Sequence, residues 1–79
     1  MNAGPFATEA EARQAAGPLP EPGSWRGHNQ RLIMGACHAA GVPLGSYDIQ
    51  IIEWLAGWEP ATCAVVAGLI SRARQAGPR

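Results

Sequence analysis

The sequence predicts an all-α protein with a compact three-helix core over residues 24–77. Apolar residues recur at spacings of three and four, glycine and proline separate the segments that show this period, and no segment has the alternation of a strand. With 79 residues, the chain is long enough for one small domain. We expect a helical domain over residues 24–79, preceded over residues 1–23 by a short N-terminal helix and a proline-rich arm.

The N-terminal segment carries a helix start signal at residues 8–11. In this capping box the Thr8 hydroxyl satisfies an early backbone amide and the Glu11 side chain reaches back, which predicts a short helix to about Ala16. Prolines at alternate positions follow within residues 17–24, and such a stretch favours an extended, polyproline-like spacer.

A second helix is expected from a Ser24 cap to about Ala40, where Gly41 and Pro43 end it. A third helix begins at Ser46 or Asp48 and ends near Gly57. The third helix is apolar over more than half of its circumference, which predicts that it is sandwiched between neighbours.

Trp54 and Trp58 are the large aromatic groups of this third segment. Trp58 is expected in the core beside the following turn, and Trp54 is expected to be partly exposed at the edge of the polar stripe. Aromatic side chains at a surface edge are common anchors of protein interfaces.

A fourth helix is expected from Glu59-Pro60 to about Ala76, with Pro60 at a position where its missing amide does no harm. Its inward stripe is predicted to comprise Thr62, Val66, Leu69, Ile70 and Ala73, with Cys63 alongside. The opposite face carries what we call the small-residue strip: Ala61, Ala64, Gly68 and Ser71, with Ala67 beside them. Such a strip lets another helix approach closely, and that helix could belong to this chain, to a second copy or to another protein.

Composition and charge exclude several classes of protein. Six arginines, no lysine and six acidic residues give a formal net charge of zero, which disfavours a strongly basic nucleic-acid binder. No apolar run approaches the roughly 20 residues that span a bilayer, and no signal peptide is recognisable. Cys37 and Cys63 are expected to be free buried thiols, which fits a reducing cytoplasm.

The residues that could carry chemistry are scattered. His28, His38, Cys37 and Cys63 lack the spacing of a zinc site. Asp48, Glu53 and Glu59 imply no paired-carboxylate geometry, and no phosphate loop or nucleophile motif occurs. We therefore expect no enzymatic activity, no metal and no cofactor.

Residues 52–72 read as helix, glycine turn and helix, and they resemble the helix-turn-helix of LuxR-type transcription regulators. The comparable positions are Leu55, Gly57, Thr62, Cys63, Val66 and Ile70. This resemblance implies a DNA-binding regulator that would use Arg26, Arg31, Arg72 and Arg74 on phosphates. The stretch from Pro18 onward is also similar to short uncharacterised proteins from GC-rich actinobacterial genomes, which implies no particular function.

The face of the fourth helix that would enter a DNA groove offers mainly alanine, glycine and serine, whereas reading bases requires hydrogen-bonding side chains. The leading expectation is therefore a small cytoplasmic, non-enzymatic protein–protein interaction or regulatory module. It would form a homodimer or bind a larger protein. The residues expected to bind the partner are Trp54, Ala61, Ala64, Gly68 and Ser71. A helix-turn-helix DNA binder is the alternative.

Overall fold

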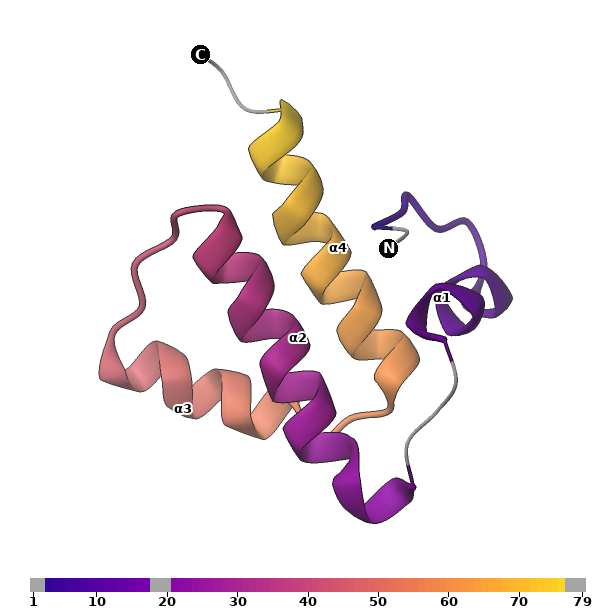
Figure 1. The fold of residues 1–79 in the computed structure, drawn as a ribbon, viewed down its shortest axis with the longest axis horizontal. Helices are drawn as coiled ribbons and strands as arrows, with labels where there is room; N and C mark the ends of the chain where they lie inside the picture. Colours follow the sequence, from indigo (N-terminus) through magenta and orange to yellow (C-terminus); the bar gives the residue numbers. More distant parts are fainter. Residues whose placement is uncertain (1–2, 18–20, 77–79) are drawn as a thin grey trace.

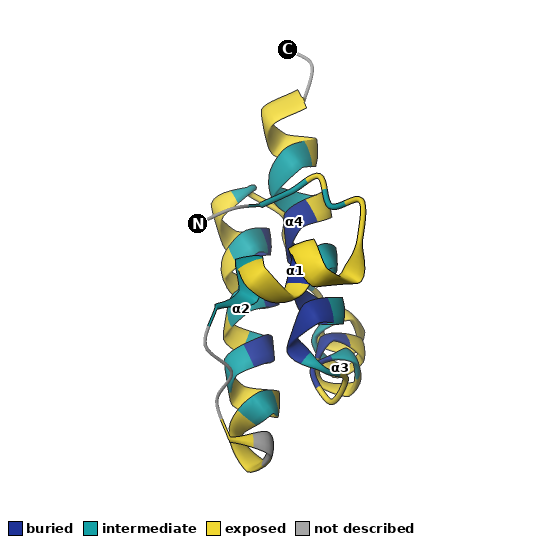
Figure 2. Ribbon diagram, turned by 90° about the vertical axis from the view of Figure 1, so that its right-hand side faces the viewer, coloured by how far each residue is buried: buried dark blue, intermediate teal, exposed yellow. Residues whose placement is uncertain are grey.

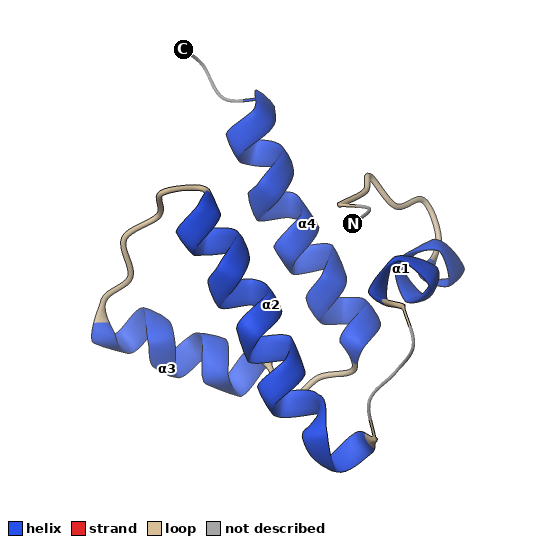
Figure 3. Ribbon diagram, in the orientation of Figure 1, coloured by secondary structure: helices blue, strands red, loops and turns tan. Residues whose placement is uncertain are grey.

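The computed structural model describes residues 3–17 and 21–76, and the helices of this part carry the fold (Figure 1). They are α1 (Glu9–Ala16), α2 (Trp25–Ala39), α3 (Ser46–Leu55) and α4 (Pro60–Ala76), with a short 3₁₀ turn, η1 (Pro22–Ser24), before α2. No strand occurs among the described residues (Figure 3). The predicted all-α class is therefore confirmed.

Helix α4 is the centre of the arrangement. It runs beside α2 in the same direction, and α1 packs against it from the other side (Figure 1). Helix α3 packs on α2 and runs across the α2–α4 pair rather than along it. The short N-terminal helix thus belongs to the packed body of the protein.

The starts of the helices follow the local sequence in part. The Thr8 hydroxyl accepts from the Glu11 amide at 3.2 Å, and the Glu11 carboxylate accepts from the Ala7 amide at 2.9 Å, which confirms the predicted capping interaction. Ser24 is the N-cap residue of α2 as predicted, but its side chain does not cap the helix. The Ser24 hydroxyl donates backward to the Glu21 carbonyl at 2.9 Å and makes no cap bond to α2.

The proline-rich arm falls partly outside the described residues, which omit positions 18–20. Where it is described, it is not extended as predicted, because residues Pro22–Ser24 form the 3₁₀ turn. The turn is closed by a hydrogen bond from the Ser24 amide to the Glu21 carbonyl at 2.8 Å.

The core is small and contains few large side chains. Its buried centre joins α2, α3 and α4, and its members are Ile33, Cys37, Ile52, Cys63 and Ala67. No aromatic side chain belongs to the buried class among the described residues. The prediction that Trp58 lies in the core is therefore wrong, since 49% of its surface is exposed.

The inward stripe predicted for α4 is correct only in part: Cys63 is fully buried and Ile70 packs against the core as expected. Leu69 and Ala73 of the expected inward stripe are exposed, whereas Ala61, Ala64 and Gly68 are buried. The reason is that α4 has a neighbour on two sides, and only small side chains leave room for both α1 and α2. The first half of α4 is consequently buried and its end is exposed (Figure 2).

Gly68 marks the closest approach on α4. A Cβ atom at this position would lie 2.4 Å from the Ala3 carbonyl oxygen and 3.3 Å from Cε2 of Phe6. The N-terminal segment therefore crosses α4 where there is no side chain, and any larger residue forces it to move.

Asn29 links α2 to the turn after α3. Its side chain is fully buried, and its Nδ2 donates to the Ala56 carbonyl at 3.0 Å and to the Trp58 carbonyl at 2.7 Å. Nearby, Nη1 of Arg26 donates to the Glu53 carbonyl at 2.5 Å. These bonds satisfy carbonyls at the end of α3 that have no partner within the helix, and they fix α3 against α2.

Candidate protein interface

Helix α3 and the turn that follows it present large apolar side chains to solvent. The exposed fractions are 71% for Tyr47, 43% for Ile51, 62% for Trp54 and 49% for Trp58. We call these four residues the outer face of α3. The predicted partial exposure of Trp54 is confirmed.

The period of the helix explains why these side chains gather. At about 100° per residue, positions 47, 51 and 54 fall on one side of the helix axis, and the ring of Trp58, in the turn after the helix, lies against that of Trp54. Ile52 and Ala56 fall on the opposite side, where they are buried against the rest of the molecule. Helix α3 is therefore apolar on two opposite faces, of which the chain itself covers only one.

Two rings of the outer face contact each other. The centroids of the Trp54 and Trp58 rings are 6.0 Å apart with an interplanar angle of 78°, an edge-to-face arrangement. Because Asn29 holds the Trp58 backbone and Arg26 holds that of Glu53, the end of α3 is anchored from within. The Trp54–Trp58 end of the outer face is thus held in place by contacts within the chain.

Charged groups lie on the flanks of α3. Asp48 accepts from the Gly45 amide at 2.9 Å and so caps the helix. Glu53 lies on the other flank, where the Arg26 guanidinium contacts its backbone carbonyl. The middle of the outer face carries no charge.

The small-residue strip does not lie open to a partner as expected. Ala61, Ala64 and Gly68 are buried and Ser71 is half-buried, because the chain's own α1, α2 and N-terminal segment cover them. The sequence-based expectation that these residues bind another protein is therefore corrected. The interpretation that the strip receives a helix of the same chain accounts for the packing.

The four arginines expected on DNA phosphates do not form one patch. Arg26 and Arg31 lie on α2, and Arg26 is engaged with the end of α3. Arg72 lies in the last turns of α4, where its Nε donates to the Gly68 carbonyl at 3.2 Å, and Arg74 follows it. Since α2 and α4 run in the same direction (Figure 1), Arg26 at the start of α2 and Arg74 near the end of α4 lie toward opposite ends of this helix pair.

Sequence reasoning missed Tyr47, Ile51 and Trp58 as surface residues. The signal was present, because α3 was expected to be apolar over more than half of its circumference. The pattern shows how much of the helix surface is apolar. It does not show which part of that surface the chain buries and which part it leaves exposed.

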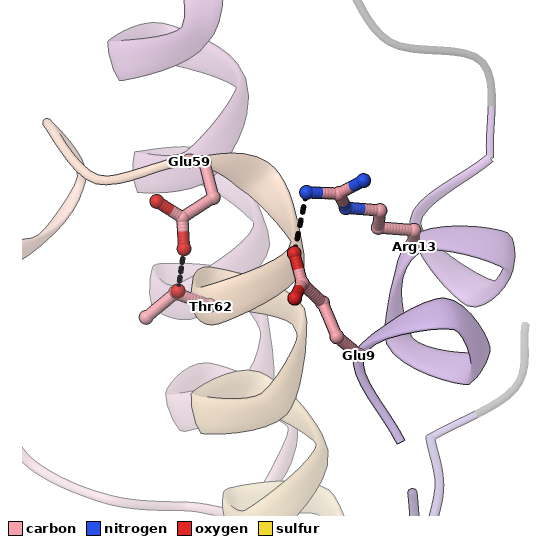
Figure 4. Close-up of polar contacts among 4 residues, drawn as sticks. All are labelled: Glu9, Arg13, Glu59 and Thr62. Carbon is pink, nitrogen blue, oxygen red and sulfur yellow. Dashed lines mark hydrogen bonds and ion pairs between the residues drawn. The ribbon is translucent and has the colours of Figure 1, made fainter.

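Two polar pairs, one within α1 and one at the start of α4, lie where these two helices meet (Figure 4). Glu9 and Arg13 form an ion pair on α1, and the Thr62 hydroxyl donates to the Glu59 carboxylate on α4. This hydroxyl lowers the pKa of Glu59, its own backbone amide lowers it further, and the charge of Arg13 adds a smaller effect that crosses between the helices.

Two hollows border α1. A cleft of about 390 Å³ separates the start of α1 from the start of α4. A groove of about 500 Å³ runs between the end of α1, α2 and α4, and its lining is mostly alanine and glycine, with His28, Arg31 and Ser71 as polar members. Neither hollow presents the large exposed side chains that distinguish the outer face of α3.

Groups capable of metal or redox chemistry are dispersed or buried. The part of the chain that the structure describes holds no cluster of three or more His, Cys, Asp or Glu residues suited to a metal ion. Cys37 and Cys63 are free and buried. Burial raises the pKa of Cys63, and the nearby Glu59 carboxylate raises it further, so this thiol stays protonated at neutral pH.

None of the helices within residues 3–17 and 21–76 is long and apolar enough to span a membrane. Comparisons of the chain with protein families, with curated proteins and with solved structures find no match. The geometry of the chain is therefore the basis for a functional hypothesis.

Proposed function

We propose that this chain is a small non-enzymatic protein–protein interaction module whose partner docks on the outer face of α3. The observation that carries the proposal is the exposure of Tyr47, Ile51, Trp54 and Trp58 on one anchored surface. Trp and Tyr dominate the binding energy of many interfaces, and contiguous apolar patches on small proteins commonly mark interaction sites.

The distribution of large side chains adds support. On folding, a domain of this size buries only about 60–65% of the surface that its unfolded chain exposes. Each aromatic side chain is therefore a large fraction of the apolar surface that the domain could bury. Here three of the five aromatic residues lie on the outer face of α3 instead of in the core. Docking of a partner there removes them from water and stabilises the folded chain by mass action.

The alternative of a helix-turn-helix DNA binder has less support. The helix that would enter the major groove is α4, and its first half is covered by α1 and α2 (Figure 2). Arginines toward opposite ends of the α2–α4 pair also provide no continuous track for phosphates.

Site-directed photocrosslinking in cells that produce the chain tests the proposal. A photoreactive benzoylphenylalanine is placed at position 51, on the outer face of α3, and in a separate variant at position 69. Leu69 is a matched control because it is also an exposed apolar residue, at 55%, but belongs to α4 and not to α3. We expect discrete protein adducts from position 51 that disappear when Trp54→Ala is added, and none from position 69.

Equal adducts from both positions, or none from position 51, would contradict the proposal. The DNA alternative is tested in parallel with a fluorescent duplex and its anisotropy at low and high salt. Binding that weakens steeply as salt rises, together with the absence of adducts from position 51, would favour a DNA-binding protein.

A further inference from the structure

We propose that the outer face of α3 docks against the same face of a second copy, so that two chains form a two-fold symmetric dimer with antiparallel α3 helices. This inference rests on the proposed function, because it names the partner of the same surface.

The size of the surface fits such a dimer. Large aromatic side chains bury about 150–250 Å² each, so at their exposed fractions Tyr47, Trp54 and Trp58 offer roughly 300–450 Å², to which Ile51 adds a smaller area. With the flanks of α3, this approaches the roughly 800 Å² per partner of a standard interface. The face is therefore large enough to hold two small chains together.

The face is also complementary to itself. It runs from Tyr47 at the start of α3 to Trp58 after its end, with Ile51 and Trp54 between them. In an antiparallel pair the two-fold axis passes near Ile51 and Trp54, and Tyr47 of each chain faces the Trp58 end of the other. Because no member of the face is charged, two copies meet without burying an unpaired charge.

The flanks of α3 suit this arrangement as well. An antiparallel two-fold pair brings the same flank of both chains together, and this flank carries both the Glu53 carboxylate and the Arg26 guanidinium, which contacts the Glu53 backbone. Each chain thus supplies both signs on this flank, while the other flank carries the Asp48 carboxylate, which its own Gly45 amide already engages. A neutral face whose rim carries both signs offers no strong charge pattern that would favour a highly acidic or basic partner over a second copy.

Light scattering and sedimentation of the purified chain over a wide concentration range test the dimer. We expect a dimer whose dissociation constant changes little with salt. Both Tyr47→Ala and Trp54→Ala are expected to weaken it at least about tenfold, while leaving the circular dichroism of the monomer unchanged. Leu69→Ala is the matched control and is expected to leave the dimer intact.

A charge-exchange experiment tests the two-fold geometry itself. Ile51→Glu places two carboxylates near the axis, and Ile51→Lys places two ammonium groups there, so each variant alone is expected to be monomeric. An equimolar mixture is expected to form a heterodimer, because the opposite charges then face each other. Restoration by mixing also shows that both variants are folded.

A wild-type chain that stays monomeric at about 0.5 mM overturns the dimer, since that concentration far exceeds the micromolar dissociation constants of even moderate interfaces. So does a dimer that Leu69→Ala weakens but Trp54→Ala does not, or a mixture of the two Ile51 variants that remains monomeric. If the chain is monomeric while position 51 still gives adducts with another protein, only the dimer fails. If position 51 gives no adduct of any kind, the proposed function fails as well.

Discussion

Helices α3 and α4 differ in how many of their faces the chain covers and in the size of the side chains on those faces. Helix α4 is covered on two sides and is built there from small residues, whereas α3 is covered on one side and carries large residues on both. The size of the side chains on α4 thus reflects how closely its neighbours approach. On α3, the large side chains of the second face are not covered by the chain, and this is the surface on which we propose that a partner docks.

The two neighbouring isoleucines of α3 give the sharpest test of this difference. Ile52 is 8% exposed on the inner face and Ile51 is 43% exposed on the outer face. We expect Ile52→Ala to lower the free energy of unfolding by about 3 kcal/mol, because it leaves a cavity in the core. Ile51→Ala should cost under about 1 kcal/mol when measured by urea unfolding at concentrations where the chain is monomeric. Equal losses would remove the distinction between the two faces.

Asn29→Ala tests whether the end of α3 is held from within. The substitution removes two hydrogen bonds and leaves the Ala56 and Trp58 carbonyls without their partner, so we expect a loss of about 2–3 kcal/mol in thermal or urea unfolding. Gln50→Ala is the control, because Gln50 is exposed on α3. A loss for Asn29→Ala no larger than that of the control would show that the buried amide does not anchor α3.

Gly68→Ala tests the close packing on α4. The new methyl group would meet the Ala3 carbonyl, so we expect a loss of about 2 kcal/mol and faster hydrogen exchange in α1. Gly35→Ala is the matched control, since nothing lies within 4 Å of a Cβ at that helical position. It should stabilise the chain by up to about 1 kcal/mol. A neutral Gly68→Ala variant would mean that the N-terminal segment does not pack on α4.

The smallest effect concerns the Thr62 hydroxyl and depends on pH. This hydroxyl lowers the pKa of Glu59 in the folded chain, so its contribution to stability is present above the ordinary glutamate pKa of about 4.3 and is lost as the pH falls through the lower folded value. Thr62→Val should therefore lower the urea midpoint slightly at pH 7 and match the wild type near pH 2. A difference that persists at pH 2 would point to packing instead.

Much of the fold could be predicted because its signals are local. The Thr8 cap, the start of α4 at Pro60 and the glycine-marked end of α2 all depend on residues within a few positions. The exposed stripe of α3 depends on which neighbours a helix finds, and periodicity does not specify this. For that reason Leu69 and Trp58 were wrongly predicted to be buried, since each lies on an apolar face that the chain leaves exposed.

The reactivity of the two buried thiols can be used to measure how often the core opens. Cys37 on α2 and Cys63 on α4 lie in one cluster, and both are buried while the helices are packed. A thiol reagent can modify them only when α2 and α4 separate, so the modification rate at saturating reagent measures how often the core opens. Comparing that rate in dilute and concentrated protein would reveal whether association on the far side of α3 slows a motion in the centre of the molecule.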